Sequence, residues 1–282
     1  MRIHITADST CDLPPALCEQ YRIAVCPLYI VMGDRAYRDA VDIRPEDIYR
    51  HVERTKTVCH TAAPNIDDYM AFYRENLMDY DAIVHFTISS DMSSCYQNAC
   101  LAAAEVGNVY VVDSRSLSLG IGLLALDAAE LAAEGKTPQE ICRETEARRD
   151  KLDISFVLDT LQYLALGGRC HAVVALGANL LGLKPTILVQ DGKMTVGKKY
   201  RMSPDRAAMR YIREHIGDPA SVDPRRVFIV DSGVSPEMRE EAAQLVHELL
   251  PEANILFGRA GCAISNHCGP NTFSLMFYRK AR

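Results

Sequence analysis

Apolar segments of strand length alternate with segments of helical spacing through the first half of this 282-residue chain, and that alternation restricts the folds open to it. In residues 65–77, apolar side chains recur near the spacing of one helix face, and Asn65 precedes them as a helix cap. Strands separated by helices of this length pair in parallel through right-handed crossovers. The sequence therefore predicts an open parallel α/β sheet. Its predicted strands are 2–7, 22–31, 81–89 and 108–114, and its predicted helices are 65–77, 92–106, 118–135 and one that begins near Pro14-Pro15.

The pattern changes after a polar helix predicted at about 137–151. Residues 183–201 read as two strands around Asp191-Gly192, and Asp-Gly is a strong signal for a two-residue hairpin turn. Further strands and helices complete a mixed sheet. We therefore expect a two-lobed α/β protein, with an N-terminal lobe of residues 1–152, a C-terminal mixed-sheet lobe of residues 153–282, and a ligand cleft between them.

The charge and hydropathy of the chain argue against several classes of protein. The formal net charge is −6, whereas a nucleic-acid groove needs a clustered basic excess. No run of about 18 apolar residues is present, so no membrane span is expected. The N-terminus MRIHITADST lacks the apolar core of a signal peptide. We therefore expect a cytoplasmic protein that binds no nucleic acid.

Ten cysteines are spread along the chain, and no two of them form a C-x-x-C pair. Zinc sites and thioredoxin-like motifs therefore lack their signature. A disulfide-rich secreted domain would be shorter and would carry a signal peptide. We expect no metal site, and we expect most of these thiols to be buried as small apolar groups.

Two catalytic interpretations rest on short motifs. GIGLLA at 120–125 matches the glycine pattern of dinucleotide-binding turns, but six residues separate it from the preceding strand end, and no strand ending in an acid follows about 20 residues later. Close packing of a buried helix is the simpler explanation of its small residues. A hydrolase would need Ser93 or Cys268 beside His267, although the G-x-S-x-G motif of serine hydrolases is absent.

Polar segments stand where the chain enters helices. TISSDMSSCYQNA places Ser93 or Ser94 near a helix N-terminus, where backbone N–H groups and the helix dipole favour an anion. An ordinary serine cap is the alternative. CHTAAPN is a similar polar turn with Thr61 as its hydroxyl, and GGRCH offers Arg169. Hydroxyls, a histidine and helix starts suit the binding of a carboxylate or phosphate better than bond cleavage.

AISNHCGPNTF, residues 263–273, sets a histidine beside a cysteine. Gly269-Pro270 follows at once, and this pair stops helices and fixes a turn. The segment is therefore either a nucleophile with its base or a rigid loop that holds one imidazole up to a ligand. Successive side chains of an extended segment diverge, which argues against direct pairing of His267 with Cys268.

Six segments occur in order over nearly the whole chain: ADSTCDLP (7–14), ISSDMSSCYQNA (88–99), VVDSRSLSLGIG (111–122), LQYLALGGR (161–169), LLGLKPTILVQDG (180–192) and NHCGPNTFSLMF (266–277). Together they resemble the DegV family. The resemblance implies a two-domain α/β protein that binds one long-chain fatty acid between its lobes. It also implies that, in bacteria with a fatty acid kinase, the protein presents the acid to a separate ATP-dependent kinase subunit. The acyl phosphate product stays bound and feeds phospholipid synthesis.

By the same resemblance, the fatty acid carboxylate is expected to bind Thr61, Ser93 and His267. Gly269-Pro270 would then fix the loop that aims His267, and Cys268 would pack inward. Expected contacts at the pocket mouth, with a phosphoryl group or with the kinase, are Ser94, Arg169 and Arg201. The chain departs from the family pattern at Ala62, Ala63, Ser94, Cys95, Cys268 and Asn271, which leaves the length and unsaturation of the acyl chain open.

The expected protein is a lipid-binding partner of a kinase, without a cofactor and not itself an enzyme. A slot for the acyl tail could be lined by residues 121–133 and 173–183, unless these residues are only core. Two alternatives stay open. One is a lipid-directed hydrolase or acyltransferase that uses Ser93 or a cysteine with His267, and the other is a dinucleotide-binding oxidoreductase.

Overall fold

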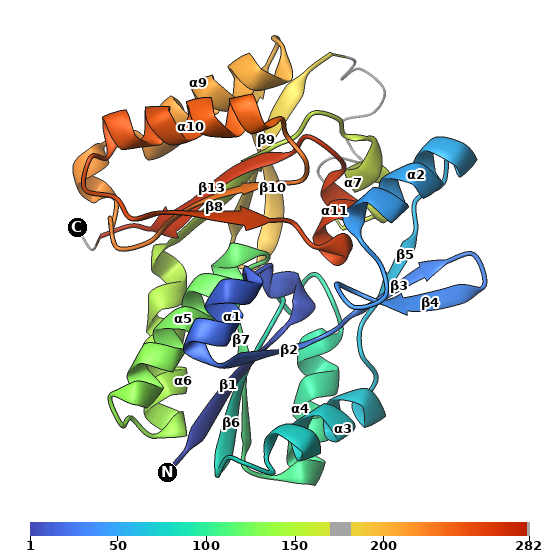
Figure 1. Ribbon diagram of the computed structural model, residues 1–282, viewed down its shortest axis with the longest axis vertical. Helices are drawn as coiled ribbons and strands as arrows, with labels where there is room; N and C mark the ends of the chain where they lie inside the picture. The colour runs from blue at the N-terminus through green and yellow to red at the C-terminus, as the bar shows by residue number, and fades with distance from the viewer. Residues whose placement is uncertain (170–181, 281–282) are drawn as a thin grey trace. The chain divides into compact units, whose positions relative to one another are not determined.

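The computed structural model describes residues 1–169 and 182–280, which divide into two compact units (Figure 1). Residues 45–60 are counted in unit 2 and residues 191–193 in unit 1, so neither unit is one continuous stretch of chain. The lobe boundary at residue 152 stays a prediction. Unit 1 comprises Met1–Arg44, Thr61–Asp150 and Asp191–Lys193, and unit 2 comprises Pro45–His60, Lys151–Gln190 and Met194–Arg282.

The main sheet of unit 1 has four strands: β1 (Ile3–Asp8), β2 (Ile23–Cys26), β6 (Ala82–Thr87) and β7 (Val109–Asp113). Their order is β2-β1-β6-β7, and each neighbouring pair runs parallel, as the alternating sequence predicts. All six residues of β6 are buried, which is typical of a parallel strand covered on both faces.

Helices cover both faces of this sheet: α1 (Pro15–Tyr21), α3 (Ile66–Asn76), α4 (Cys95–Val106), α5 (Leu119–Ala133) and α6 (Pro138–Arg148). α5 packs with α6 on one face, and α3 packs with α4 on the other (Figure 1). Asn65 caps α3 as predicted, since its side chain accepts from the Asp68 N–H while the Asp68 carboxylate accepts from the Asn65 N–H. Unit 1 is therefore a three-layer α/β structure.

The order of connection reverses across this sheet between β1 and β6. From β1 the chain passes to β2 on one side, and it later places β6 and then β7 on the other side. Ligands of open α/β sheets bind outside the carboxyl ends of the strands at such a reversal. Asp8 ends β1 and residues 88–93 follow β6, so both lie where this fold favours a ligand.

The prediction of a single strand at 22–31 is wrong, because the chain divides there between two sheets. β3 (Tyr29–Met32) belongs to a second sheet with β4 (Arg35–Arg38) and β5 (His60–Ala62), in the order β4-β3-β5. Pro27 has no N–H for a strand ladder. The Leu28 N–H donates to the Ser9 Oγ at 3.0 Å. A side chain from another part of unit 1 therefore ends β2.

The sheet of unit 2 is mixed, as predicted, and has six strands: β8 (Leu152–Val157), β9 (Lys184–Gln190), β10 (Lys193–Tyr200), β11 (Val227–Asp231), β12 (Ile255–Arg259) and β13 (Phe273–Tyr278). Their order is β10-β9-β8-β13-β11-β12. β11 and β12 run parallel, whereas β13 runs antiparallel to both β11 and β8. β9 and β10 join at the predicted Asp191-Gly192 turn.

Five described helices belong to unit 2: α2 (Pro45–Thr55), α7 (Gln162–Gly167), α9 (Pro204–Ile216), α10 (Pro236–Leu249) and α11 (Cys262–Cys268). α9 and α10 pack side by side over the sheet (Figure 1). The core of unit 2 lies beneath them and includes Tyr211, Ile229 and Phe277. α11 packs instead against α2 and α7.

Side-chain contacts hold residues 45–60 within unit 2. The Tyr49 hydroxyl donates to the Ser232 carbonyl oxygen at 3.0 Å. The Arg259 Nη2 lies 2.6 Å from the Glu46 Oε1.

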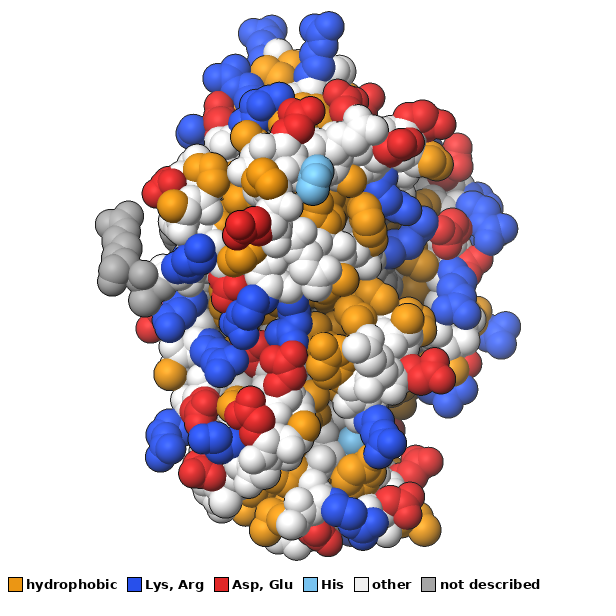
Figure 2. Space-filling model, turned by 60° about the vertical axis from the view of Figure 1, so that its left-hand side comes forward, with side chains coloured by type: hydrophobic (Ala, Val, Ile, Leu, Met, Phe, Trp, Pro, Cys, Tyr) orange, Lys and Arg blue, Asp and Glu red, His pale blue; other side chains and the backbone are white. Residues whose placement is uncertain are grey.

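The surface carries charges of both signs. On the face shown in Figure 2, Lys and Arg side chains lie among Asp and Glu side chains. Among the described residues, this face therefore lacks the clustered basic excess that a phosphate backbone requires. None of the described helices combines the length and the hydrophobicity that a membrane crossing needs.

Candidate ligand-binding site

Ser93 lies in the turn between β6 and α4. Its N–H donates to the Ser89 carbonyl oxygen at 3.2 Å, and its Oγ accepts from the Cys95 N–H at 3.3 Å. The Ser93 Oγ also lies 3.1 Å from the Cys95 Sγ. Ser93 is half-buried, whereas Ser94, directly before α4, is exposed. The backbone at the start of α4 therefore fixes the position of the Ser93 hydroxyl.

A buried carboxylate anchors the start of this turn. Asp8 is 0% exposed, and its Oδ2 accepts from the Ile88 N–H at 3.1 Å. Its Oδ1 accepts from the Tyr69 hydroxyl at 2.6 Å and lies 3.2 Å from the His85 Nε2. Since Ile88 opens the turn that leads to Ser93, Asp8 fixes the backbone that carries Ser93.

Thr61 is half-buried and lies in the short strand β5, rather than in the polar turn expected from the sequence. Three residues later, the Pro64 carbonyl oxygen accepts from the Asn98 Nδ2 at 2.9 Å. Asn98 stands at the start of α4, the helix that follows Ser93. Unit 1 therefore joins the segment that carries Thr61 to the helix that follows Ser93.

His267 stands on a helix, so the predicted rigid loop is wrong. Residues Cys262–Cys268 form α11, and His267 occupies its last turn. The predicted stop is correct, because Gly269 ends the helix with a φ of 75°, a conformation that favours glycine. Cys268 is 5% exposed and packs inward, as expected.

Two glycines let aromatic rings lie against the backbone at this site. A Cβ added at Gly167, the last residue of α7, would lie 2.2 Å from the His267 Nδ1. A Cβ added at Gly269 would lie 2.6 Å from the Tyr163 Cδ2. A side chain at Gly167 would displace the imidazole, so this glycine helps to set the position of His267.

Burial and a neighbouring cation both lower the pKa of His267. The pKa falls from 6.5 to about 4, first because burial disfavours the imidazolium and second because the Arg169 guanidinium is positive. Arg169 itself is exposed, and its Nη1 donates to the Gly167 carbonyl oxygen at 2.8 Å. His267 is therefore neutral at pH 7 and presents one ring N–H donor.

Replacing Arg169 by Gln should raise the pKa of His267 without restoring it to 6.5, because burial is the larger cause of the shift. NMR titration of the His267 ring protons would measure the change. Arg225→Gln is the matched control, since the Arg225 Nη2 lies 2.9 Å from Asp223 Oδ2 on its own loop. A His267 pKa that stays near 4 in Arg169→Gln would contradict the electrostatic link.

The residue before His267 binds a part of the chain far away in sequence. The Asn266 Nδ2 donates to the Cys59 carbonyl oxygen at 2.8 Å, and the Asn266 Oδ1 accepts from the Cys59 N–H at 3.1 Å. Asn266 is 0% exposed and Cys59 is 3% exposed. Cys59 precedes Thr61 by two residues. This clamp therefore ties the chain that leads to Thr61 to the helix that carries His267.

Unit 2 thus brings Arg169 and His267 together. Arg201 is exposed and follows β10, the edge strand of the mixed sheet. The carboxylate-binding roles stay predictions, as do the contacts expected at the pocket mouth, Ser94, Arg169 and Arg201. The predicted tail-lining segment 173–183 lies outside the described residues, except for Gly182 and Leu183.

Helix α5, the other predicted wall of the acyl slot, is buried over most of its length. A Cβ added at Gly122 would lie 2.7 Å from the Leu119 Cδ2 and 3.1 Å from the Cys11 carbonyl oxygen. The glycine at this position allows α5 to pack closely, as predicted for GIGLLA. That α5 also lines an acyl slot stays a prediction.

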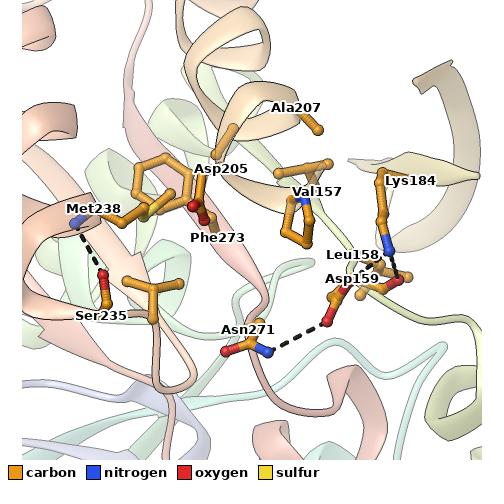
Figure 3. Close-up of a pocket in the computed structure, with 13 residues that line it drawn as sticks. Val157, Leu158, Asp159, Lys184, Asp205, Ala207, Ser235, Met238, Asn271 and Phe273 are labelled. Atoms are coloured by element: carbon orange, nitrogen blue, oxygen red, sulfur yellow. Dashed lines mark hydrogen bonds and ion pairs between the residues drawn. The ribbon is translucent and has the colours of Figure 1, made fainter. Parts of the chain in front are cut away.

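Unit 2 contains a cavity of about 270 Å³ that the sequence did not predict (Figure 3). The Lys184 Nζ lies 2.6 Å from the Asp159 Oδ1, and the Asn271 Nδ2 donates to the Asp159 Oδ2 at 3.3 Å. Figure 3 shows both side chains pointing toward Asp159. Lys184, the cation in the wall of this cavity, therefore already forms an ion pair with Asp159. The apolar lining consists of Val157, Leu158, Pro204, Ala207, Ala208, Val234, Met238 and Phe273.

The part of the chain that is described contains no candidate metal centre. Within it, no group of three or more His, Cys, Asp or Glu side chains is arranged to hold a metal ion. The nine described cysteines are free thiols, and most of them are buried. Burial raises the pKa of the Cys95 thiol, so the sulfur beside Ser93 is protonated at pH 7.

Residues 2–280 match the sequence model of the DegV family, which is described as a family of uncharacterised proteins. The chain belongs to the DegV family. A DegV domain-containing protein of Caldanaerobacter subterraneus subsp. tengcongensis is 30% identical over 99% of both chains.

Solved structures of DegV proteins share this fold over their whole length. A fatty-acid-binding DegV family protein from Thermus thermophilus has a TM-score of 0.89 and 31% identity, with 99% of this chain and 100% of that chain covered. A stearic acid-binding protein from Eubacterium ventriosum has a TM-score of 0.84 and 25% identity, with 99% and 98% covered. These structural neighbours bind fatty acids.

Proposed function

We propose that this chain binds one long-chain fatty acid, with the carboxylate held by Thr61, Ser93 and His267. The observation that carries the proposal is the similarity over the whole chain to the fatty-acid-binding DegV protein of T. thermophilus, at a TM-score of 0.89 and 31% identity. The position of Ser93 at the reversal point of a parallel sheet supports it, since ligands bind there in open α/β folds.

The chemistry of the proposed ligands suits a carboxylate. A buried charge is costly unless several donors meet it. A neutral His267 would supply one N–H, while Thr61 and Ser93 would supply hydroxyl groups. Each hydrogen bond to a charged group contributes about 1.5–3 kcal/mol. The acyl chain would contribute most of the remaining affinity, at about 0.8 kcal/mol for each buried methylene.

We further propose that the chain is not itself an enzyme and presents the acid to a separate ATP-dependent kinase subunit. That subunit would form the acyl phosphate, which feeds phospholipid synthesis. The exposed residues Ser94, Arg169 and Arg201 would meet the phosphoryl group or the kinase. Because ATP is a cytoplasmic metabolite, we place this activity in the cytoplasm.

The alternative of a hydrolase or acyltransferase gains no support from the described contacts. The Ser93 Oγ contacts the Cys95 N–H and Sγ, which are not bases at pH 7. The Cys268 Sγ lies 3.5 Å from the Gly269 carbonyl oxygen. A covalent adduct with an acyl or fluorophosphonate probe would revive this alternative.

Mass spectrometry of an organic extract of the purified, folded protein tests the proposal directly. A fatty acid present in stoichiometric amount is the expected result, and its length and unsaturation would define the ligand class. An empty protein, a lipid that carries a headgroup or a nucleotide would contradict the proposal.

Single substitutions at the proposed ligands should weaken the binding of stearic acid to delipidated protein. His267→Ala and Ser93→Ala are each expected to raise the dissociation constant about 10- to 100-fold, the effect of one lost hydrogen bond to a charged group. Isothermal titration calorimetry would measure it. His247→Ala, which changes an exposed histidine on α10, is the matched control. Unchanged affinity in both His267→Ala and Ser93→Ala would show that these side chains do not bind the carboxylate.

A further inference from the structure

The turn between β9 and β10 is held by side chains from distant parts of the sequence, although Asp191 at its tip is exposed. Asp191 and Gly192 have φ values of 49° and 79°, as a type I′ turn requires. Gly192 is buried. Residues 191–193 cluster with unit 1, while the strands on either side belong to unit 2. The environment of this tip is therefore set by residues of unit 1.

Two side chains of unit 1 hold the tip through its backbone. The Ser89 Oγ, in the loop after β6, donates to the Gly192 carbonyl oxygen at 2.7 Å. The Arg115 Nη2, in the loop after β7, donates to the Asp191 carbonyl oxygen. Both hydrogen bonds are made to backbone carbonyl oxygens, so they fix where the backbone of the tip lies.

Ser89 also closes the turn that carries Ser93. Its carbonyl oxygen accepts from the Met92 N–H at 2.9 Å and from the Ser93 N–H at 3.2 Å, and its Oγ accepts from the Asp91 N–H at 3.3 Å. Ser89 is 0% exposed. One buried residue therefore bonds both to the hairpin tip and to the backbone of Ser93.

Arg115 makes a second connection between the tip and the turn. Its Nη1 lies 2.6 Å from the Asp91 Oδ2 and 3.3 Å from the Ser90 Oγ. The same guanidinium donates to the Asp191 carbonyl oxygen. The cation thus contacts two consecutive residues of the turn while it holds the tip.

The fit between the tip and these side chains leaves no room for a side chain on the glycine. A Cβ added at Gly192 would lie 2.6 Å from the Arg115 Cζ and 2.7 Å from the Ser89 Oγ. Glycine is therefore favoured at this position by the positive φ, and a larger residue would displace the Ser89 and Arg115 side chains.

We propose that the Asp191-Gly192 tip positions the turn that presents Ser93 to the ligand, with Ser89, Arg115 and Gly192 as positioning residues. The inference rests on the proposed function of Ser93. It adds that residues 191–193, which cluster with the rest of unit 1, help to set the geometry of Ser93, so a change at this tip alters fatty acid affinity without touching the ligand.

Gly192→Ala tests the inference, with Gly33→Ala as its matched control. Gly33 occupies the turn between β3 and β4 with a φ of 62°, and nothing lies within 4 Å of its added Cβ. Both variants carry the backbone strain of a positive φ, but only Gly192→Ala collides with Ser89 and Arg115. We expect Gly192→Ala to weaken stearic acid binding at least about 5-fold and to speed amide exchange at Ser93, while Gly33→Ala does neither.

Ser89→Ala is a second variant that leaves the hairpin backbone intact, in case Gly192→Ala does not fold. It removes the hydrogen bonds of the Ser89 Oγ with the Gly192 carbonyl oxygen and with the Asp91 N–H, and it should also speed amide exchange at Ser93. Unchanged affinity and unchanged Ser93 exchange in both variants would overturn the inference. If the wild-type protein binds no stearic acid, the proposed function fails, and Ser93 exchange alone decides whether the tip holds the turn.

Discussion

Replacing Asp8 by Ala is expected to lower the free energy of unfolding by about 3–5 kcal/mol. The carboxylate is 0% exposed and is met by the Tyr69 hydroxyl, the Ile88 N–H and the His85 imidazole. Its removal leaves buried polar groups without an acceptor, and each such group costs about 1–3 kcal/mol. The chain contains no tryptophan, so circular dichroism during urea unfolding is the suitable measurement.

Asp42→Ala is the matched control for this prediction. Asp42 also accepts from a side chain and a backbone N–H, both of Arg38, but it lies at the surface with 37% of its side chain exposed. An exposed pair of this kind contributes little to stability, so Asp42→Ala should leave the free energy of unfolding nearly unchanged. Asp8→Asn should fall between the two alanine variants, because it retains one acceptor oxygen. If Asp8→Ala remains within 1 kcal/mol of the wild type, then the buried carboxylate does not anchor unit 1.

Replacing Asn266 by Ala is expected to lower the free energy of unfolding by about 2–4 kcal/mol. The substitution removes both hydrogen bonds to Cys59 and leaves a buried N–H and a buried carbonyl oxygen unpaired. It also releases the chain two residues before Thr61 from the helix that carries His267. Stearic acid affinity should therefore fall together with stability, and urea unfolding and calorimetry would measure the two effects.

Asn98→Ala separates this effect from the general loss of an asparagine. Asn98 donates one hydrogen bond to the Pro64 carbonyl oxygen and is only half-buried. Its replacement should cost about 1 kcal/mol. Amide exchange at Cys59 is a second measurement, and it should become faster in Asn266→Ala alone. Equal losses of stability in the two variants, with unchanged exchange at Cys59, would show that the clamp holds nothing in place.

The sheets could be predicted because apolar periodicity is a local property of the chain. The parallel strands of unit 1 and the Asp191-Gly192 turn each carry their own signal, and they were confirmed, except that the strand predicted at 22–31 is divided between β2 and β3. Helices α2 and α9 were not predicted. In α2 only Ile48 and Val52 are buried, so its pattern is weak, and one helix on which it packs, α11, lies about 200 residues further along the chain. The end of β2 likewise depends on Ser9, which local pattern does not reveal.

The contacts of the candidate site were even harder to predict from local sequence pattern than the helices and strands. Hydroxyls before a helix drew attention to Ser93 because an N-terminus has a recognisable local pattern. The supports of the site had no such pattern, since the Asp8 bond to Ile88 joins residues 80 positions apart and the Asn266 bonds join residues 207 positions apart. Periodicity within a short window cannot report contacts at such separations. The only signals that the sequence offered for these supports were Asp8, which ends the first strand, and Asn266, which directly precedes His267.

Each unit includes a segment that lies, in the sequence, between stretches of the other unit, and this affects folding during synthesis of the chain. Cys59 leaves the ribosome 207 residues before Asn266, its hydrogen-bond partner. At about 5–20 residues per second this is a wait of roughly 10–40 s. Unit 1 likewise lacks its residues 191–193 until much of unit 2 has been translated. Neither unit can therefore reach its final contacts as its own main stretch emerges, and the last steps of folding fall near the end of translation.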